Sequence, residues 1–429
     1  MEILKDKNFL FLFLGRIVTN IGDSLYYVAT MWLVYELSQS SFYVGLAGFL
    51  VLVPKALQFL TGPFVDKWDI KKILVTTQLL QCLLLILIPV AYTLHFLTVP
   101  FLLVLMPCIA IIEEFAYPTQ TKALPLILKK TDLIKGNSLF SFAYQGVDLV
   151  FNALAGILVA LIGAISLFIV DSVTFGIAAM LFSFLKIPKK RKAQLAADVR
   201  EEAAFISYKR DLFEGFSIVF GSLLWVFLLG SVVANFAIGM TMAILPSFAN
   251  NIGGVEMYGF LLTAVSAGSL IGALLGSVLG KFRVGVISIV CFALGAGSWT
   301  LSALIGSPII STVLFGLAWI PIGAVNVLFA GIDQAVLPNH VLGRVNSVMY
   351  SISVVAMPIG SLLGGYLATT MSSSTIFAFT GIGVFFISLV WLAHPDLRTL
   401  PKAHDIDAST FKINTQSFDH DTGKEAPFG

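Results

Sequence analysis

Acidic side chains stand inside long apolar runs of this 429-residue sequence, where water is not available to solvate an ionised group. Asp23, Glu113, Glu114, Asp148 and Asp171 all occupy such positions. Burial disfavours the charged form of a carboxyl group, so a group of this kind can take up and release a proton near neutral pH. The chemistry that these residues predict is therefore reversible proton binding.

The local sequence ranks these acids as proton-coupling groups. Glu113 is the first candidate, because Pro118 cannot donate a hydrogen bond to the carbonyl of Glu114 and should weaken the helix at that point. Asp23, in a polar patch, is the second candidate and Asp148 the third. Glu114 is adjacent to Glu113 but should project about 100° away from it on a helix.

Two basic residues, Arg16 and Lys55, also lie within apolar runs. Each could neutralise a buried acid in a purely structural ion pair, and for Asp171 we favour this structural role. A charge at bilayer depth is costly and indicates function by default. Both roles therefore stay open for the other acids.

The composition indicates which elements position these residues. Hydrophobic residues make up 58% of the chain and charged residues 12%, against about 25% charged in soluble domains. A helix that crosses a bilayer needs about 20 apolar residues, and the unbroken runs lack the alternation of barrel strands. We expect twelve transmembrane helices, at about residues 9–35, 42–62, 73–95, 99–121, 139–163, 165–186, 222–248, 257–280, 284–305, 308–332, 346–369 and 374–394.

Basic residues follow a one-sided distribution along these helices. Of the 26 Lys and Arg residues, all but Arg16 and Lys55 fall at the N-terminus, in alternate loops and adjoining helix ends, or in the C-terminal tail. Basic loops stay on the cytoplasmic side of a membrane. We therefore expect both termini in the cytoplasm, which requires an even number of spans.

The chain repeats itself across a basic linker. "KALPLILKKTDLIKGNSLFS" (122–141) is similar to "QAVLPNHVLGRVNSVMYS" (334–351), and an internal repeat indicates a duplicated architecture. Two parallel halves are typical of secondary transporters, which bind substrate between the halves near mid-membrane. We predict an N-terminal half (1–186), a basic linker with an interfacial helix (187–221), a C-terminal half (222–394) and a disordered cytoplasmic tail (395–429).

The stretch "GPFVDKWDIKK" between the second and third spans contains Gly62, Asp66, Lys67, Lys71 and Lys72. It resembles the Gly-x-x-x-Asp-(Arg/Lys) signature of the major facilitator superfamily, which ends in basic residues. The form "DKWDIKK" is similar to that of the macrolide-efflux-like branch of drug:proton antiporters. "YPTQTKALPLIL" and "FIVDSVTF" also resemble that branch, after helix 4 and in helix 6.

The resemblance implies a cytoplasmic latch between the halves. In the family, the signature aspartate contacts the start of helix 11 when the cytoplasmic side is shut, so Asp66 would meet Arg344 and the backbone near Asn346. An acid also suits the positive N-terminus of a helix. The alternative for Lys71 and Lys72 is that they serve membrane orientation alone.

The resemblance also implies proton-coupled efflux of hydrophobic or cationic drug-like compounds by alternating access, in a multi-pass protein of the bacterial plasma membrane. The alternatives are a dedicated exporter of a metabolite, siderophore or lipid, and an uptake transporter of the same fold. No hydrolase, metalloprotease or phosphate-loop motif is present, so we expect no enzyme activity, catalytic residue, metal or cofactor. The expected partners are small-molecule substrate, protons and the lipid bilayer; we expect no nucleic acid, and a monomer.

Overall fold

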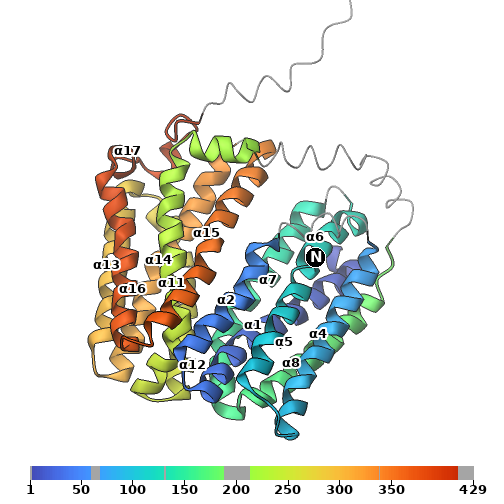
Figure 1. Cartoon of the computed structure of the whole chain (residues 1–429). Coiled ribbons are helices and arrows are strands. Elements are labelled where there is room, and N and C mark those ends of the chain that lie inside the picture. Colours follow the sequence, from blue (N-terminus) through green and yellow to red (C-terminus); the bar gives the residue numbers. More distant parts are fainter. Residues whose placement is uncertain (1, 59–67, 130–131, 188–212, 338, 414–429) are drawn as a thin grey trace, which may run out of the picture.

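The computed structural model describes residues 2–58, 68–129, 132–187, 213–337 and 339–413. In this part of the chain long helices dominate, in two groups on either side of the linker (Figure 1). The first group comprises α1 (Lys7–Ser38), α2 (Ser41–Ala56), α4 (Ile70–Thr93), α5 (Val99–Glu113), α6 (Ala116–Ile127), α7 (Leu133–Ile162) and α8 (Ala164–Ser183). The second comprises α11 (Leu224–Ile252), α12 (Val255–Leu279), α13 (Val284–Leu304), α14 (Pro308–Val336), α15 (Asn339–Leu367) and α16 (Ser373–Ala393).

The helices confirm an all-α membrane protein. Ten helical stretches in the described residues are long and apolar enough to cross a membrane, with α5 and α6 counted as one stretch. The shorter apolar helix α2 and the 30-residue α7 complete a set that is consistent with twelve spans. The expected span at 284–305, for example, corresponds to α13 at Val284–Leu304, because the length of an apolar run fixes where a helix can leave the hydrocarbon.

The fourth span is broken in the middle, as Pro118 predicts. Helix α5 ends at Glu113 and α6 begins at Ala116, so Glu114 and Phe115 form a turn between them. The proline removes a donor that a continuous helix would need. Helix α15 differs from expectation, because it begins at Asn339 and places Arg344 and Asn346 beyond its first turn. The unpaired amides of a helix start therefore lie at its first four residues, 339–342.

The two halves meet at the end of the bundle opposite the linker. We call these contacts the interhalf seal: Gly45 of α2 against Ser361 and Gly365 of α15, Gly156 of α7 against Gly259 of α12, and Trp32 stacked on Tyr258 at 5.3 Å. The hydroxyl of Ser361 also donates to the carbonyl of Gly45 at 3.1 Å. Toward the linker the two halves diverge (Figure 1).

Residues 395–413 are ordered, which corrects the expectation of a disordered tail for this part. Leu397, Leu400, Phe411 and Ile413 are buried, and the amide of Leu223 donates to the carbonyl of Phe411 at 2.9 Å. The amide of Val284 donates to Pro401, and that of Ala403 to Gly280, so the segment ties down the α12–α13 loop. Apolar side chains beneath the loop ends drive this packing. We call residues 395–413 the C-terminal clasp.

Other predicted segments lie partly or wholly outside the described residues. Residues 213–220 of the linker are helical, whereas 188–212 are not described. The same holds for 59–67, which contain Gly62, Asp66 and Lys67, and for the tail after residue 413. The interfacial helix and the latch accordingly stay predictions.

Candidate functional site

A cavity of about 610 Å³ lies between the two halves. Its lining comes from α1, α2, α5 and α7 on one side and from α11, α12, α14 and α15 on the other. The N-terminal half supplies the acids and the lysine: Asp23, Lys55, Glu113, Glu114 and Asp148, together with Asn20, Ser24 and Tyr144. The C-terminal half supplies a largely apolar wall that includes Ile238, Met242, Leu262, Val265, Trp319, Val354 and Met357.

Helix α1 positions the acids through a face of small polar residues. Asn20 and Ser24 are four residues apart and so point in one direction. The Asn20 amide donates to the carbonyls of Ala143 and Tyr144, both at 3.0 Å, and the Ser24 hydroxyl donates to Asp148 Oδ1 at 2.9 Å. Hydrogen bonds of this kind join helices in membranes, at about 0.6 kcal/mol each on average. They fix α7 against α1 and hold Asp148 at the cavity wall.

Glu113 and Glu114 both line the cavity. We expected their side chains to diverge by about 100° on a continuous helix, but the helix ends after Glu113 and the following turn brings Glu114 to the same wall. The Glu114 carboxyl is hydrogen-bonded to the side chain of Gln58. Two neighbouring acids therefore line the N-terminal side of the cavity at the break in the fourth span.

The two basic residues of the N-terminal half differ in their surroundings. Lys55 lines the cavity and interacts electrostatically with Tyr144, Tyr350 and both glutamates. Arg16 is buried behind the wall, where its Nη1 donates to Gln120 Oε1 at 3.3 Å. Among the described residues neither cation forms a salt bridge with an intramembrane acid, so the structural pairs that we considered are absent there.

Aromatic faces take the place of a carboxylate beside Arg16. Its guanidinium carbon lies 4.8 Å from the ring centre of Tyr117 and 4.6 Å from that of Tyr144. A desolvated cation over an aromatic ring gains about 2 kcal/mol. Arg16 therefore braces Tyr144, whose other surroundings include the cavity and Lys55.

The remaining predicted residues lie elsewhere. Asp171 is fully buried on α8 and does not line the cavity. Lys71 and Lys72 are in the first turn of α4, whose N-cap is Asp69; the Asp69 carboxylate accepts from the Lys72 amide at 3.2 Å. Asp69 therefore caps the start of α4.

Sequence reasoning missed the contribution of α15 to the site. Tyr350, Val354 and Met357 line the cavity, and their spacing of four and three residues places them on one helical face. That spacing was visible in the sequence. Nothing in the sequence indicated that this face, rather than another, meets the acids of the N-terminal half.

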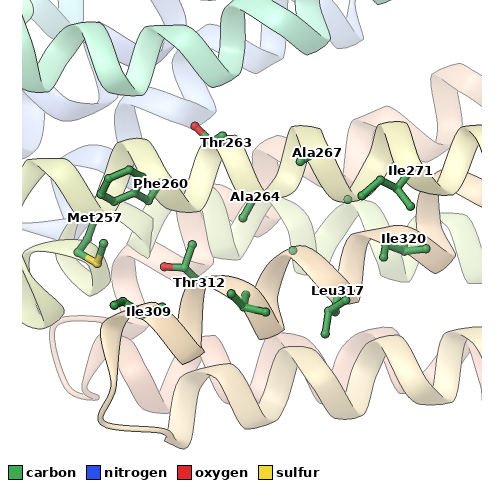
Figure 2. A pocket seen from close by; sticks show the side chains of 13 residues that line it. Met257, Phe260, Thr263, Ala264, Ala267, Ile271, Ile309, Thr312, Leu317 and Ile320 are labelled. Carbon is green, nitrogen blue, oxygen red and sulfur yellow. The ribbon is translucent and has the colours of Figure 1, made fainter.

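A second hollow, between α12 and α14, offers no such chemistry. It has a volume of about 560 Å³ and an apolar lining that includes Phe260, Ile271 and Leu317 (Figure 2). Its two hydroxyls are engaged within their own helices: Thr263 donates to Gly259 at 2.8 Å and Thr312 donates to Pro308 at 2.9 Å. The central cavity, which collects the ionisable groups, is the candidate substrate site.

The chain can now be compared with known proteins. The Multidrug efflux pump Tap of Mycolicibacterium fortuitum is 24% identical over 405 residues, which cover 92% of this chain and 97% of Tap. Macrolide efflux protein A of Streptococcus pyogenes is 24% identical over 401 residues, covering 90% and 95%. The crystal structure of a bacterial homologue of the human lysosomal transporter Spinster, inward-facing and unoccupied, superimposes with a TM-score of 0.63 at 13% identity, covering 94% and 97%.

These comparisons agree with the resemblance to the macrolide-efflux-like branch and with the absence of an enzymatic role. The solved structure shows the fold alone, since its sequence identity is low. A family model for transmembrane secretion effectors matches residues 2–424, almost the whole chain. The protein therefore belongs to the transmembrane secretion effector family of major facilitator superfamily transporters.

Proposed function

We propose that this transporter exports amphipathic, cationic, drug-like compounds in exchange for protons. The observation that carries the proposal is the division of the central cavity into two unlike walls. Four carboxyl groups, those of Asp23, Glu113, Glu114 and Asp148, line the N-terminal side, and apolar side chains dominate the C-terminal side. The names of two relatives, a multidrug efflux pump and a macrolide efflux protein, support the direction of transport.

A cationic amphiphile would place one end against each of these walls. Its charged group would lie against the acids, which are costly to leave unpaired at this depth. Its apolar body would lie against Trp319, Met242 and Met357, and flexible methionines adapt to different shapes. Most of the binding free energy would come from buried apolar area, with orientation set by the few polar groups.

The orientation of the chain in the membrane determines to which side the cavity opens in the described conformation. The distribution of Lys and Arg favours a cytoplasmic location for the linker end of the bundle. The interhalf seal would then close the outer side, and the cavity would be reached from the cytoplasm. Alternating access would open this seal and join the linker ends, where Asp66 would contact the first turn of α15, at 339–342.

Proton exchange would use the break in the fourth span. A proton that enters from outside would bind Glu113, weaken its attraction for the bound cation and so release the substrate outward. The turn at Glu114–Phe115 would let the two parts of this span move separately. Asp23 and Asp148 would share the role, because both line the same wall.

Transport into inside-out vesicles tests the proposal. The panel pairs each cationic amphiphile with a neutral compound of the same shape, with and without an imposed proton gradient. The parent should accumulate the cations more strongly when the gradient is present. Glu113→Gln should still bind the neutral compounds, bind the cations more weakly and lose gradient-driven accumulation.

Glu36→Gln is the matched control, because Glu36 is exposed at the far end of α1, outside the cavity. It should transport like the parent. If Glu113→Gln pumps as well as the parent across a range of gradients, Glu113 is not the coupling group. Carriage of a single neutral lipid or siderophore, with no cation transported, would replace the proposal with a dedicated exporter.

A further inference from the structure

Asp171 is a buried carboxyl group that the substrate cavity does not use. It lies on α8 with 0% exposure, and it faces α1 at Gly22. A Cβ atom at Gly22 would lie 2.6 Å from Asp171 Oδ1 and 2.8 Å from the hydroxyl of Thr174. Only a glycine at this position leaves room for the carboxyl group, so α1 carries a notch here.

The carboxyl group has few hydrogen-bond donors. The Thr174 hydroxyl lies 3.4 Å from Oδ1 but only 2.7 Å from the main-chain carbonyl of Asp171, and its single proton is shared between them. Oδ2 has no partner in the described part of the chain. An ionised carboxylate in such a place would be strongly destabilised. The neutral, protonated form avoids this cost.

The charged and titratable groups around Asp171 come from three helices. Asp23, next to Gly22 on α1, Tyr26 on the same helix and Glu113 on α5 all interact electrostatically with Asp171. From α4 comes the thiol of Cys82, 3.4 Å from the hydroxyl of Ser172. Arg16 lies two turns before Asp23 on α1, but Gln120 and two aromatic rings engage its guanidinium.

A buried polar layer behind α1 contains one unused hydrogen-bond donor. Thr19 donates to Gln78 at 3.0 Å, and Gln78 donates to Gln81 at 3.1 Å. The amide nitrogen of Gln81 has no partner among the described residues. Gln81 precedes Cys82, whose carbonyl accepts from Ser172, the neighbour of Asp171, at 2.8 Å. The unused donor therefore belongs to the same layer of the bundle as the carboxyl group.

We propose that Asp171 is a second proton-binding site, separate from the substrate cavity, that exchanges its proton with Asp23 through the notch at Gly22. The O–H bond of Asp171 breaks and the proton binds the carboxylate of Asp23, which lines the cavity. Asp171 is left as a carboxylate, with the Thr174 hydroxyl as a donor and the unpaired amide of Gln81 in the same layer of the bundle. A bound cation cannot compete for this proton, because Asp171 does not line the cavity.

The proposal rests on the proton exchange proposed above and adds about one proton to each transport cycle. Two measurements test it. Infrared difference spectroscopy of the reconstituted protein should show a protonated-carboxyl band at neutral pH that shifts in D₂O. One such band should disappear in Asp171→Asn and persist in Glu36→Gln.

The second measurement is the slope of the logarithm of cation accumulation against the imposed pH difference, which reports the protons exchanged per substrate by linkage. Asp171→Asn should lower this slope by about one and change cation affinity by less than about twofold, because it does not touch the substrate. Should Asp171→Asn fail to fold, Thr174→Val gives a second infrared test. Loss of the hydroxyl donor should move the Asp171 band to higher frequency.

If Asp171→Asn removes none of the protonated-carboxyl bands of the parent, or if Thr174→Val moves none of them, the assignment is overturned. An unchanged slope in Asp171→Asn, beside a parent driven by the gradient, would overturn this inference alone. A parent whose accumulation ignores the gradient would overturn both this inference and the proton exchange on which it rests.

Discussion

Adding one methyl group at Gly156 should shift this transporter toward its outward-open state. Gly156 of α7 belongs to the interhalf seal, and a Cβ atom there would lie 2.4 Å from the Cα of Gly259 on α12. Ordinary contact begins at 3.4 Å. The nearest atoms are main-chain atoms, which cannot rotate away. Gly156→Ala must therefore push α7 and α12 apart by about 1 Å wherever the seal is closed.

The size of the effect follows from the cost of overpacking, which is about 1–3 kcal/mol for an extra methyl group in a well-packed site. The cost applies only to the conformation in which the seal is closed, because the proposed alternating access would separate these helices. The ratio of outward-open to inward-open molecules should rise by about 5- to 150-fold. Apparent affinity for substrate from the cytoplasmic side should fall with the inward-open fraction.

Spin-label distances measure this ratio directly. Glu36 of α1 and Asn250 of α11 are exposed near the sealed end of different halves. Cysteines at these two positions, in a chain whose three native cysteines are replaced by serine, would carry the labels. Double electron–electron resonance should show a population of longer distances that grows in Gly156→Ala.

Gly297→Ala on α13 is the control, because a Cβ atom there meets no atom within 4 Å. It should leave the distances unchanged. Gly365→Ala probes the other part of the seal, where a Cβ atom would lie 2.6 Å from the carbonyl of Ser41, and it should shift the distances in the same direction. Unchanged distances in both seal variants would refute the claim that these glycines hold the outer side shut.

Four further outcomes are expected. Phe411→Ala in the C-terminal clasp should lower the free energy of unfolding in detergent by about 3 kcal/mol, because Phe411 is buried. Phe282→Ala, at an exposed position, should not lower it. Equal losses in the two variants would contradict the role of the clasp. Arg16→Lys should lose about 1 kcal/mol of stability in the same assay, because an ammonium cannot stack on two rings. Hydrogen bonds from Ser409 and Thr410 lower the pKa of Asp407 to about 2. The contribution of Asp407 to the stability of the clasp should therefore be fully present above pH 3.8 and be lost as the pH falls toward 2. Amide hydrogen exchange of the clasp should lose this pH dependence in Asp407→Asn. A cysteine at Asn250 should react with an impermeant reagent from outside only, and labelling from the cytoplasm would reverse the orientation.

The sequence predicts the spans well because hydrophobic length is a local property. Helix α16, for example, covers Ser373–Ala393 where 374–394 was expected. The break in the fourth span was predictable for the same reason, since Pro118 acts on the carbonyl four residues before it. The early start of α15 also has a local signal, because Pro338 directly precedes Asn339 in the sequence and proline is tolerated at a helix start but not inside a helix.

The C-terminal clasp was not predictable, because its stability comes from distant partners. Its apolar residues follow no helical or strand period, and the groups that they meet lie near Leu223 and in the α12–α13 loop. The same limit applies to the site. Which groups surround Arg16 depends on how α6 and α7 pack against α1, and the aromatic rings of Tyr117 and Tyr144 occupy that position.

The two walls of the central cavity differ in how freely their residues can be substituted. Changes on the faces of α11, α12, α14 and α15 alter shape and apolar area without touching an ionisable coupling group of the N-terminal half. Selection for a new compound can therefore act on one half of the gene while the other keeps the acids of the proposed proton exchange. Variants selected for an altered substrate range should cluster at positions such as Met242, Val265 and Met357, which makes the duplicated fold readily evolvable.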